Sequence, residues 1–359
     1  FAADDKGYKI IYLDGVATNT GVFDAALSSA GITFKEGGTN FTNSLLVGTD
    51  TTGTLSSAVG NTGVGTGVFG ALTTGDNNVA VGLNALDVMT TAAQNTAIGA
   101  CALVTTTTGG CNTGVGFLAL KANTGGFNVA IGRCSLHTNT TADNNTAVGI
   151  DSLKDNTTGT VNTAMGRQSL QNNTTASGNT AYGHNTLNTV TTSGCNTAVG
   201  GSALFNNTGA TNVAVGHSAL TANTSGSSNV AVGTGAMCTT TTGAGNTAIG
   251  ECAMKANTEG TLNVVAGHRA MCTNTTGSRN VAIGQCTMKL NTTGSCNNAI
   301  GQFALCSNTS GLNNQAMGHS AMAKNTTGCC NVGIGLSALT TNTTANDNTA
   351  VGTSAMAAN

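Results

Sequence analysis

The sequence predicts an all-β protein, a parallel β-solenoid of about eighteen coils of 17 residues behind a short N-terminal cap. Three observations predict it. An asparagine recurs at a nearly constant spacing from Asn61 to Asn348, a glycine follows it four residues later in every unit, and a large apolar residue follows eight residues later. A repeat this short cannot bury an apolar face alone, so each unit must stack on its neighbours.

We number each unit from its recurrent asparagine, which is position 1. The spacing is 17 residues except between 112 and 128 and between 196 and 212, where it is 16. Stacking would place each asparagine above the next, so we expect this column to form a buried amide ladder. Its members are Asn61, Asn78, Asn95, Asn112, Asn128, Asn145, Asn162, Asn179, Asn196, Asn212, Asn229, Asn246, Asn263, Asn280, Asn297, Asn314, Asn331 and Asn348.

The unit reads N-[T/V]-A-[V/I]-G-x-x-[A/S]-L-x-x-N-T-T-G-x-x. Alternation at positions 2 to 4 predicts a short strand with one inward side chain, and positions 8 to 11 predict a second strand. Glycines at positions 5 and 15, such as Gly149 and Gly159, predict two corners with positive φ. Coils about 4.8 Å apart would make a rod on the order of 85 Å long.

The first 42 residues differ from the repeats, because they are denser in charge and hold two of the three tyrosines. Residues 8–13 and 31–34 read as strands. We expect residues 1–42 to be a cap or adaptor that covers the open end of the solenoid. Residues 43–60 resemble a degenerate first coil, and residues 61–359 form the repetitive shaft. The start without Met and the end within a coil suggest a fragment or a processed product.

The composition favours a structural protein over an enzyme. Charged residues make up 7% and aromatic residues 3%, and Pro and Trp are absent, whereas about a quarter of an ordinary domain is charged. A net charge of -2 argues against a nucleic-acid partner. No apolar run approaches the roughly 20 residues of a membrane span, and no signal peptide is evident.

No catalytic or cofactor-binding constellation stands out. Residues 65–70 spell G-x-G-x-x-G, but the match falls inside a repeat with no helical pattern after it, so we interpret it as chance. No nucleophile lies in a recognisable arrangement with a base. We therefore expect no enzymatic activity and no cofactor.

Eleven of the twelve cysteines share three repeat positions, namely 7, 10 and 17. Cys238 and Cys252, like Cys272 and Cys286, join position 10 of one coil to position 7 of the next. This recurrence suggests disulfides between successive coils and an oxidising, extracellular setting. The alternative is that cysteine only fills a small, half-buried space. The absence of C-x-x-C argues against a zinc site.

Four of the five histidines, His184, His217, His268 and His319, occupy position 6. On one chain they are too far apart to share a metal ion, although three copies around an axis could bring them together. Position 6 also accepts residues as different as Leu83 and Glu251. A tolerant surface site is therefore the better interpretation, and we expect no metal site.

Position 12 is asparagine in most coils, followed two residues later by Thr or Ser. This spacing matches the acceptor motif for N-glycosylation, although Asn-Thr-Thr-Gly is also ordinary turn chemistry. The candidate acceptors are Asn139, Asn156, Asn173, Asn223, Asn274, Asn291, Asn308, Asn325 and Asn342.

The repeat N-[T/V]-A-[V/I]-G-x-x-[A/S] resembles the head repeat of trimeric autotransporter adhesins of Gram-negative bacteria, whose motif is close to N-S-V-A-I-G-x-x-S. It is also similar to repeats of phage and large-virus tail-fibre proteins. The resemblance covers residues 43–359. It implies a left-handed parallel β-roll, three chains around one axis and a role in surface attachment. The N-T-T-G corner is an addition to the adhesin pattern, whose coils are shorter.

Three functions follow as hypotheses. The first is a non-catalytic fibre or adhesin shaft that extends an attachment apparatus from a virion or cell surface. The second is a self-assembling extracellular filament, and the third is an ice-binding solenoid with a threonine array at positions 13 and 14. The expected partners are further copies of the chain, as a homotrimer or a filament, and a surface receptor or glycan bound by parts outside this sequence.

Overall fold

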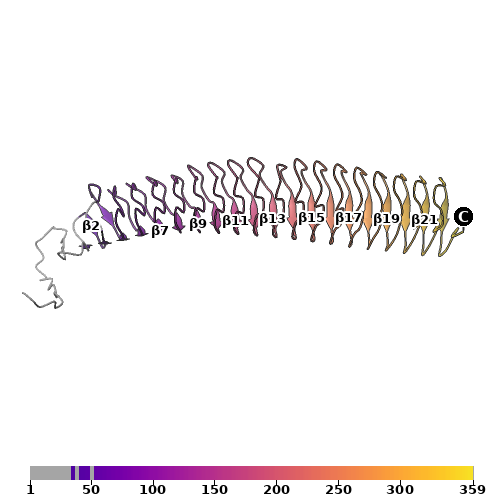
Figure 1. The fold of residues 1–359 in the computed structure, drawn as a ribbon, viewed down its shortest axis with the longest axis horizontal. Coiled ribbons are helices and arrows are strands. Elements are labelled where there is room, and N and C mark those ends of the chain that lie inside the picture. Colours follow the sequence, from indigo (N-terminus) through magenta and orange to yellow (C-terminus); the bar gives the residue numbers. More distant parts are fainter. Residues whose placement is uncertain (1–33, 37–39, 49–51, 359) are drawn as a thin grey trace, which may run out of the picture.

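The computed structural model describes residues 34–36, 40–48 and 52–358. In these ranges the protein is all-β without a helix, and the coils stack in a single, gently curved row (Figure 1). The predicted parallel β-solenoid is confirmed.

Each coil from β5 onward contributes one strand of three residues, at positions 2 to 4. The strands are β1 (Phe34–Glu36), β2 (Phe41–Thr42), β3 (Leu45–Val47), β4 (Ala58–Val59), β5 (Thr62–Val64), β6 (Val79–Val81), β7 (Thr96–Ile98), β8 (Thr113–Val115), β9 (Val129–Ile131), β10 (Thr146–Val148), β11 (Thr163–Met165), β12 (Thr180–Tyr182), β13 (Thr197–Val199), β14 (Val213–Val215), β15 (Val230–Val232), β16 (Thr247–Ile249), β17 (Val264–Ala266), β18 (Val281–Ile283), β19 (Asn298–Ile300), β20 (Gln315–Met317), β21 (Val332–Ile334) and β22 (Thr349–Val351).

The register of the sheet follows the repeat. Every strand from β5 to β22 pairs in parallel with the next, so that equivalent residues lie side by side, as Ala147 of β10 does with Ala164 of β11. The 16-residue intervals leave this register intact, because Thr113 of β8 still pairs with Val129 of β9. The missing residue must therefore be absorbed outside the strand.

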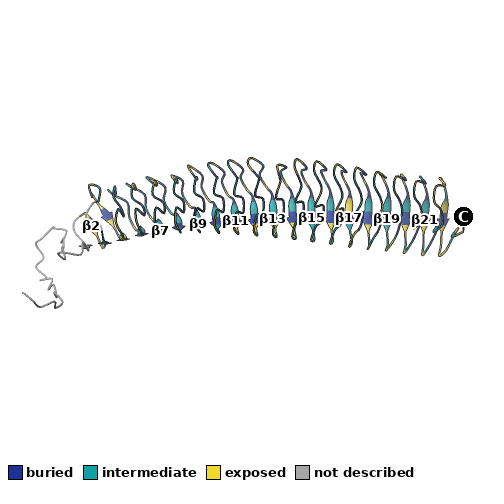
Figure 2. Ribbon diagram, viewed as in Figure 1, coloured by how far each residue is buried: buried dark blue, intermediate teal, exposed yellow. Residues whose placement is uncertain are grey.

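The core is one narrow column inside the coils. It is built from the small residue at position 3, the small residue at position 8 and the Leu or Met at position 9, as in Ala147, Ser152 and Leu153, all fully buried. Along each strand, buried and more exposed residues alternate (Figure 2). One large side chain per coil fills the interior at the density that protein cores require.

The predicted second strand at positions 8 to 11 is wrong. This stretch is a series of turns, in which position 9 adopts a left-handed conformation, with φ of 48° at Leu153 and 48° at Met254. An extended backbone would alternate its side chains across the wall, whereas this tight turn directs the one large side chain inward. The backbone still bonds between coils, since the N–H of Leu153 donates to the carbonyl of Ser169 at 3.0 Å.

Positive φ was predicted for the glycines at positions 5 and 15, and it is confirmed at position 5 and wrong at position 15. Gly149, at position 5, has φ of 131°, and a Cβ there would lie 2.6 Å from the carbonyl oxygen of Gly166 in the next coil. Gly159, at position 15, does not have positive φ. Its constraint is space, because a Cβ would lie 2.2 Å from the carbonyl oxygen of Ala176.

The repeat pattern continues one coil before Asn61. β3 pairs in parallel with β5, and the Oγ of Ser44 accepts the backbone N–H of Asn61 at 2.8 Å, in the place of a ladder asparagine. β1 pairs antiparallel with β3, so it covers the edge of that coil. The strand predicted at 8–13 lies outside the described residues, as does most of 31–34.

Candidate functional site

The asparagines at position 1 form a continuous hydrogen-bonded ladder inside the rod. The Oδ1 of Asn145 accepts the backbone N–H of Asn162 at 2.9 Å and its Nδ2–H at 3.2 Å. The Nδ2 of Asn162 also donates to the carbonyl of Ala176, at position 15 of its own coil, at 2.8 Å. The same pattern ties each strand start to the coil before it and to the far corner of its own coil. Asn61 through Asn331 are buried in this column.

A second ladder runs along position 12. The Nδ2 of Asn156 donates to Asn139 Oδ1 at 2.8 Å and to the carbonyl of Gly159 at 3.0 Å. The sequence left this column open between glycosylation acceptors and ordinary turn chemistry. Position 12 holds Leu72 and Met89 in the first two coils and asparagine in most later coils. Because the two apolar residues indicate a buried position, they could have identified the asparagines as buried too.

The second ladder is broken twice, at Val190 and at Thr240. The Oδ1 atoms of the preceding asparagines, Asn173 and Asn223, are buried without a partner, and so is the Oγ1 of Thr240. Valine has no donor to offer, which explains the orphaned acceptor at Asn173. Each orphaned buried group costs about 1 to 3 kcal/mol.

The burial of position 12 contradicts the glycosylation hypothesis. Eight of the nine candidate acceptors are fully buried and the ninth, Asn342, is 2% exposed. The Nδ2 that would carry the sugar donates to two carbonyl oxygens instead. A glycan would break the ladder and has no room inside the coil, so the folded rod excludes glycosylation at Asn139, Asn156, Asn173, Asn223, Asn274, Asn291, Asn308, Asn325 and Asn342.

Position 13 is a third hydrogen-bonded column, and most of its threonines are half-buried. The Oγ1 of Thr157 donates to the carbonyl of Thr174 at 2.9 Å, and Thr174 repeats the bond to Thr191 at 3.0 Å. These hydroxyl protons are therefore used between coils and are not free for an ordered water layer. The position-13 half of the threonine array that suggested ice binding is part of the structural framework.

Position 14 is the residue that the 16-residue coils lack. In these coils Asn-Thr-Gly replaces Asn-Thr-Thr-Gly, at Asn123 and at Asn207. The ladders continue past the deletion, since Asn139 Nδ2 donates to Asn123 Oδ1 at 2.7 Å. Position 14 thus lies on an outer bend that can shorten without disturbing the interior.

All twelve cysteines are free thiols, so the disulfides predicted for Cys238 with Cys252 and for Cys272 with Cys286 are not formed. The position-10 thiols instead face carbonyls of the next coil, as Cys272 Sγ does Lys289 O at 3.7 Å. Burial raises the pKa of the Cys238 and Cys272 thiols, although neighbouring cations oppose the shift. Raised pKa values disfavour the reactive thiolate.

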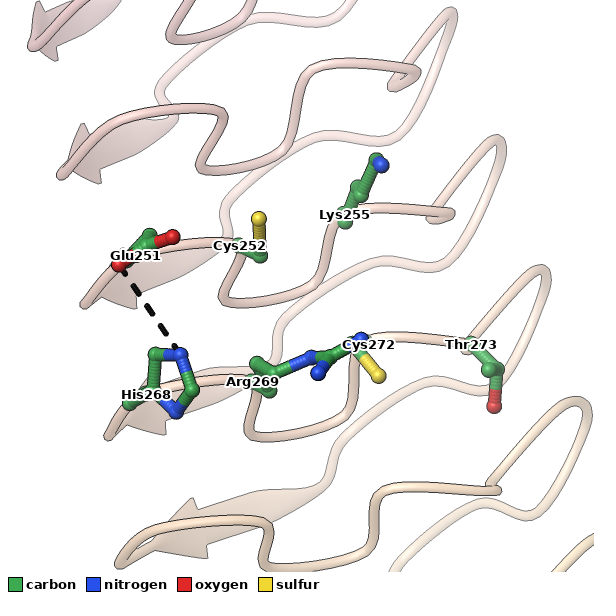
Figure 3. A pocket seen from close by; sticks show the side chains of 7 residues that line it. All are labelled: Glu251, Cys252, Lys255, His268, Arg269, Cys272 and Thr273. Atoms are coloured by element: carbon green, nitrogen blue, oxygen red, sulfur yellow. Dashed lines mark ion pairs between the residues drawn. The ribbon is translucent and has the colours of Figure 1, made fainter.

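One pocket, of about 470 Å³, lies on the outside of two successive coils (Figure 3). Its lining pairs an acid with a base, because His268 Nε2 is 4.0 Å from Glu251 Oε2 across the coils, and both side chains are about half exposed. Cys252 and Cys272 come from the two coils and do not join. The full lining is Glu251, Cys252, Lys255, His268, Arg269, Cys272 and Thr273.

The position-6 histidines remain separate along the rod. His217 Nδ1 lies 3.1 Å from the Oγ of Ser218, and His319 makes the equivalent contact with Ser320 at 3.0 Å. Across the described residues, no three His, Cys, Asp or Glu side chains gather closely enough to hold a metal ion. The fifth histidine, His137, lies at position 10, where burial and then Lys121 and Lys154 lower its pKa.

Comparison of the sequence with protein families and with curated proteins gives no match. Within the part of the chain that the structure describes, no helix is long and apolar enough to cross a membrane. The architecture is therefore the basis for any functional conclusion.

Proposed function

We propose that this chain is a non-catalytic structural shaft, part of an extracellular fibre or adhesin that holds an attachment apparatus away from a virion or cell surface. The observation that supports the proposal is that the recurrent polar side chains hydrogen-bond within the rod. The asparagines of positions 1 and 12 and the threonines of position 13 bond from coil to coil. These hydrogen bonds stabilise a long, stiff rod, and they leave few polar side chains that could take part in a reaction.

The alternatives receive less support. In a head-to-tail filament the N-terminal segment of one copy would dock on the open end of the next, but β1 of that segment is already paired with β3 of its own chain. Ice binding loses one of the two threonine columns on which it was based, because the position-13 hydroxyls donate to carbonyls of the next coil.

Surface labelling of the source organism or virion tests the proposed location. Lys255 and Lys324 are exposed and can react with an amine reagent that does not cross membranes. On intact particles or cells the protein should become labelled, while an internal marker protein stays unlabelled. Labelling that requires lysis would contradict an extracellular shaft.

A further inference from the structure

The outward face of the parallel sheet has an apolar column that runs the length of the rod. At position 4 the residue is Val, Ile, Met, Tyr or Ala in every coil. These side chains point away from the core, and Val64, Ile98, Ile249, Ile283 and Met317 are 40 to 47% exposed. We call these eighteen position-4 residues, from Val64 to Val351, the outer stripe.

Strand propensity does not account for the outer stripe. Position 2 lies on the same face of the same strands, and it holds Thr in about half of the coils as well as Asn298 and Gln315. Threonine favours strands as valine does, yet it never occurs at position 4, where the non-branched Met165 and Met317 do occur. The selected property is therefore apolarity, at a position that water would reach in an isolated rod.

The dimensions of the outer stripe match a protein interface. Eighteen strands about 4.8 Å apart and a width of roughly 10 Å give an area on the order of 800 Å², which is what one partner of a stable complex buries. Neither position 2 nor position 4 has a charged residue in any coil. Depletion of charge is typical of the core of an interface.

We propose that the outer stripe binds a second copy of this chain, face to face along the rod. A partner must present apolar side chains at the same spacing over the same length, and this chain itself has that surface. Packed sheets lie about 10 Å apart, so facing stripes would interdigitate and remove both from water. The proposal does not depend on the shaft function, since a rod could associate in any setting.

The test is the mass of the full chain by light scattering. Wild type should have at least twice the chain mass of 35.1 kDa. The triple variant Ile249→Lys, Ile283→Lys and Met317→Lys places charges on the outer stripe and should have the mass of one chain. The matched control Gln285→Lys, Gln302→Lys and Leu336→Lys adds the same charge at position 6 and removes one exposed apolar residue, so it should retain the wild-type mass.

A milder variant separates loss of association from loss of folding. Ile249→Thr, Ile283→Thr and Met317→Thr keep strand-forming residues, so circular dichroism should be unchanged while the dimer dissociates at a concentration at least tenfold higher than wild type. A wild-type mass of one chain would overturn the proposal. Wild-type association in both folded stripe variants would overturn it as well.

Discussion

The asparagines at position 1 determine most of the specificity of this fold. Each position-1 amide bonds to the coil on either side and to the far corner of its own coil, which a residue of another type cannot do at once. Asn246, for example, accepts two bonds from Asn263 at 3.0 Å and donates to Asn229 at 3.2 Å and Gly260 at 2.8 Å. Truncation removes all four bonds and leaves the buried backbone N–H of Asn263 without its acceptor, whereas Asn229 Oδ1 and Gly260 O each keep another donor.

We therefore expect Asn246→Ala to lower the free energy of unfolding by about 2 to 5 kcal/mol. Urea unfolding followed by circular dichroism measures it. Gln302→Ala is the control, because it removes only an exposed bond to Gln285 and should change stability by about 0.5 kcal/mol or less. Equal effects of the two substitutions would refute the ladder's role.

The breaks in the second ladder offer a stabilising substitution. Val190→Asn should donate to the orphaned Oδ1 of Asn173 and give Asn207 an acceptor. Relief of one buried unsatisfied group and the new bond should add about 1 to 3 kcal/mol to the free energy of unfolding. Thermal melts of wild type, Val190→Asn and Val190→Ala measure this gain. A melting temperature of Val190→Asn at or below that of wild type would show that the site cannot accommodate the amide.

His137 should make the folded rod modestly less stable in acid. Its pKa is lowered by burial and by Lys121 and Lys154, so the unfolded chain takes up a proton more readily than the rod. Stability is therefore lost as the pH falls through about 6.5, the ordinary histidine pKa, and the loss ends below the folded-state pKa. The melting temperature of His137→Gln should fall less than that of wild type between about pH 7.5 and pH 5. Equal falls in the two melting temperatures would show that His137 does not cause the loss of stability.

At the scale of the coil, the sequence predicts the period, the first strand and the inward residues, because a strict repeat fixes which side chains must stack. It does not predict the turn at positions 8 to 11. Leu153 in a left-handed conformation contradicts its local preference, and only stacking on both neighbours stabilises it. The glycosylation motif at Asn156 is misleading for the same reason, since burial is a property of the stack.

Single-residue deletions should separate the outer bend from the strand. Deletion of Thr293 reproduces the natural 16-residue coil and should cost about 0.5 kcal/mol or less. Deletion of Ala282 shifts Ile283 to the inward position, so it should cost more than about 3 kcal/mol, because a one-residue slip reverses the faces of a strand. Chemical denaturation of both variants measures the difference, and similar stabilities would contradict the register.

At the scale of the whole molecule, the structure is one-dimensional, since each coil contacts its neighbours and the rod lengthens by one strand spacing per coil. The core is thin and almost uncharged. Its stability comes from repetition of the same few bonds. The proposed shaft function and the proposed outer stripe both follow from this geometry, because each needs a regular surface of defined length.

The most direct test is the change in maximum dimension, measured by small-angle X-ray scattering, when residues 229–296 are deleted. These are four whole coils, so both ladders rejoin in register at Ser228 and Asn297. The rod should shorten by about 19 Å, at about 4.8 Å per strand spacing, with its cross-section unchanged. A shortening of only a few ångström, as expected for a compact globule, would contradict the solenoid shaft.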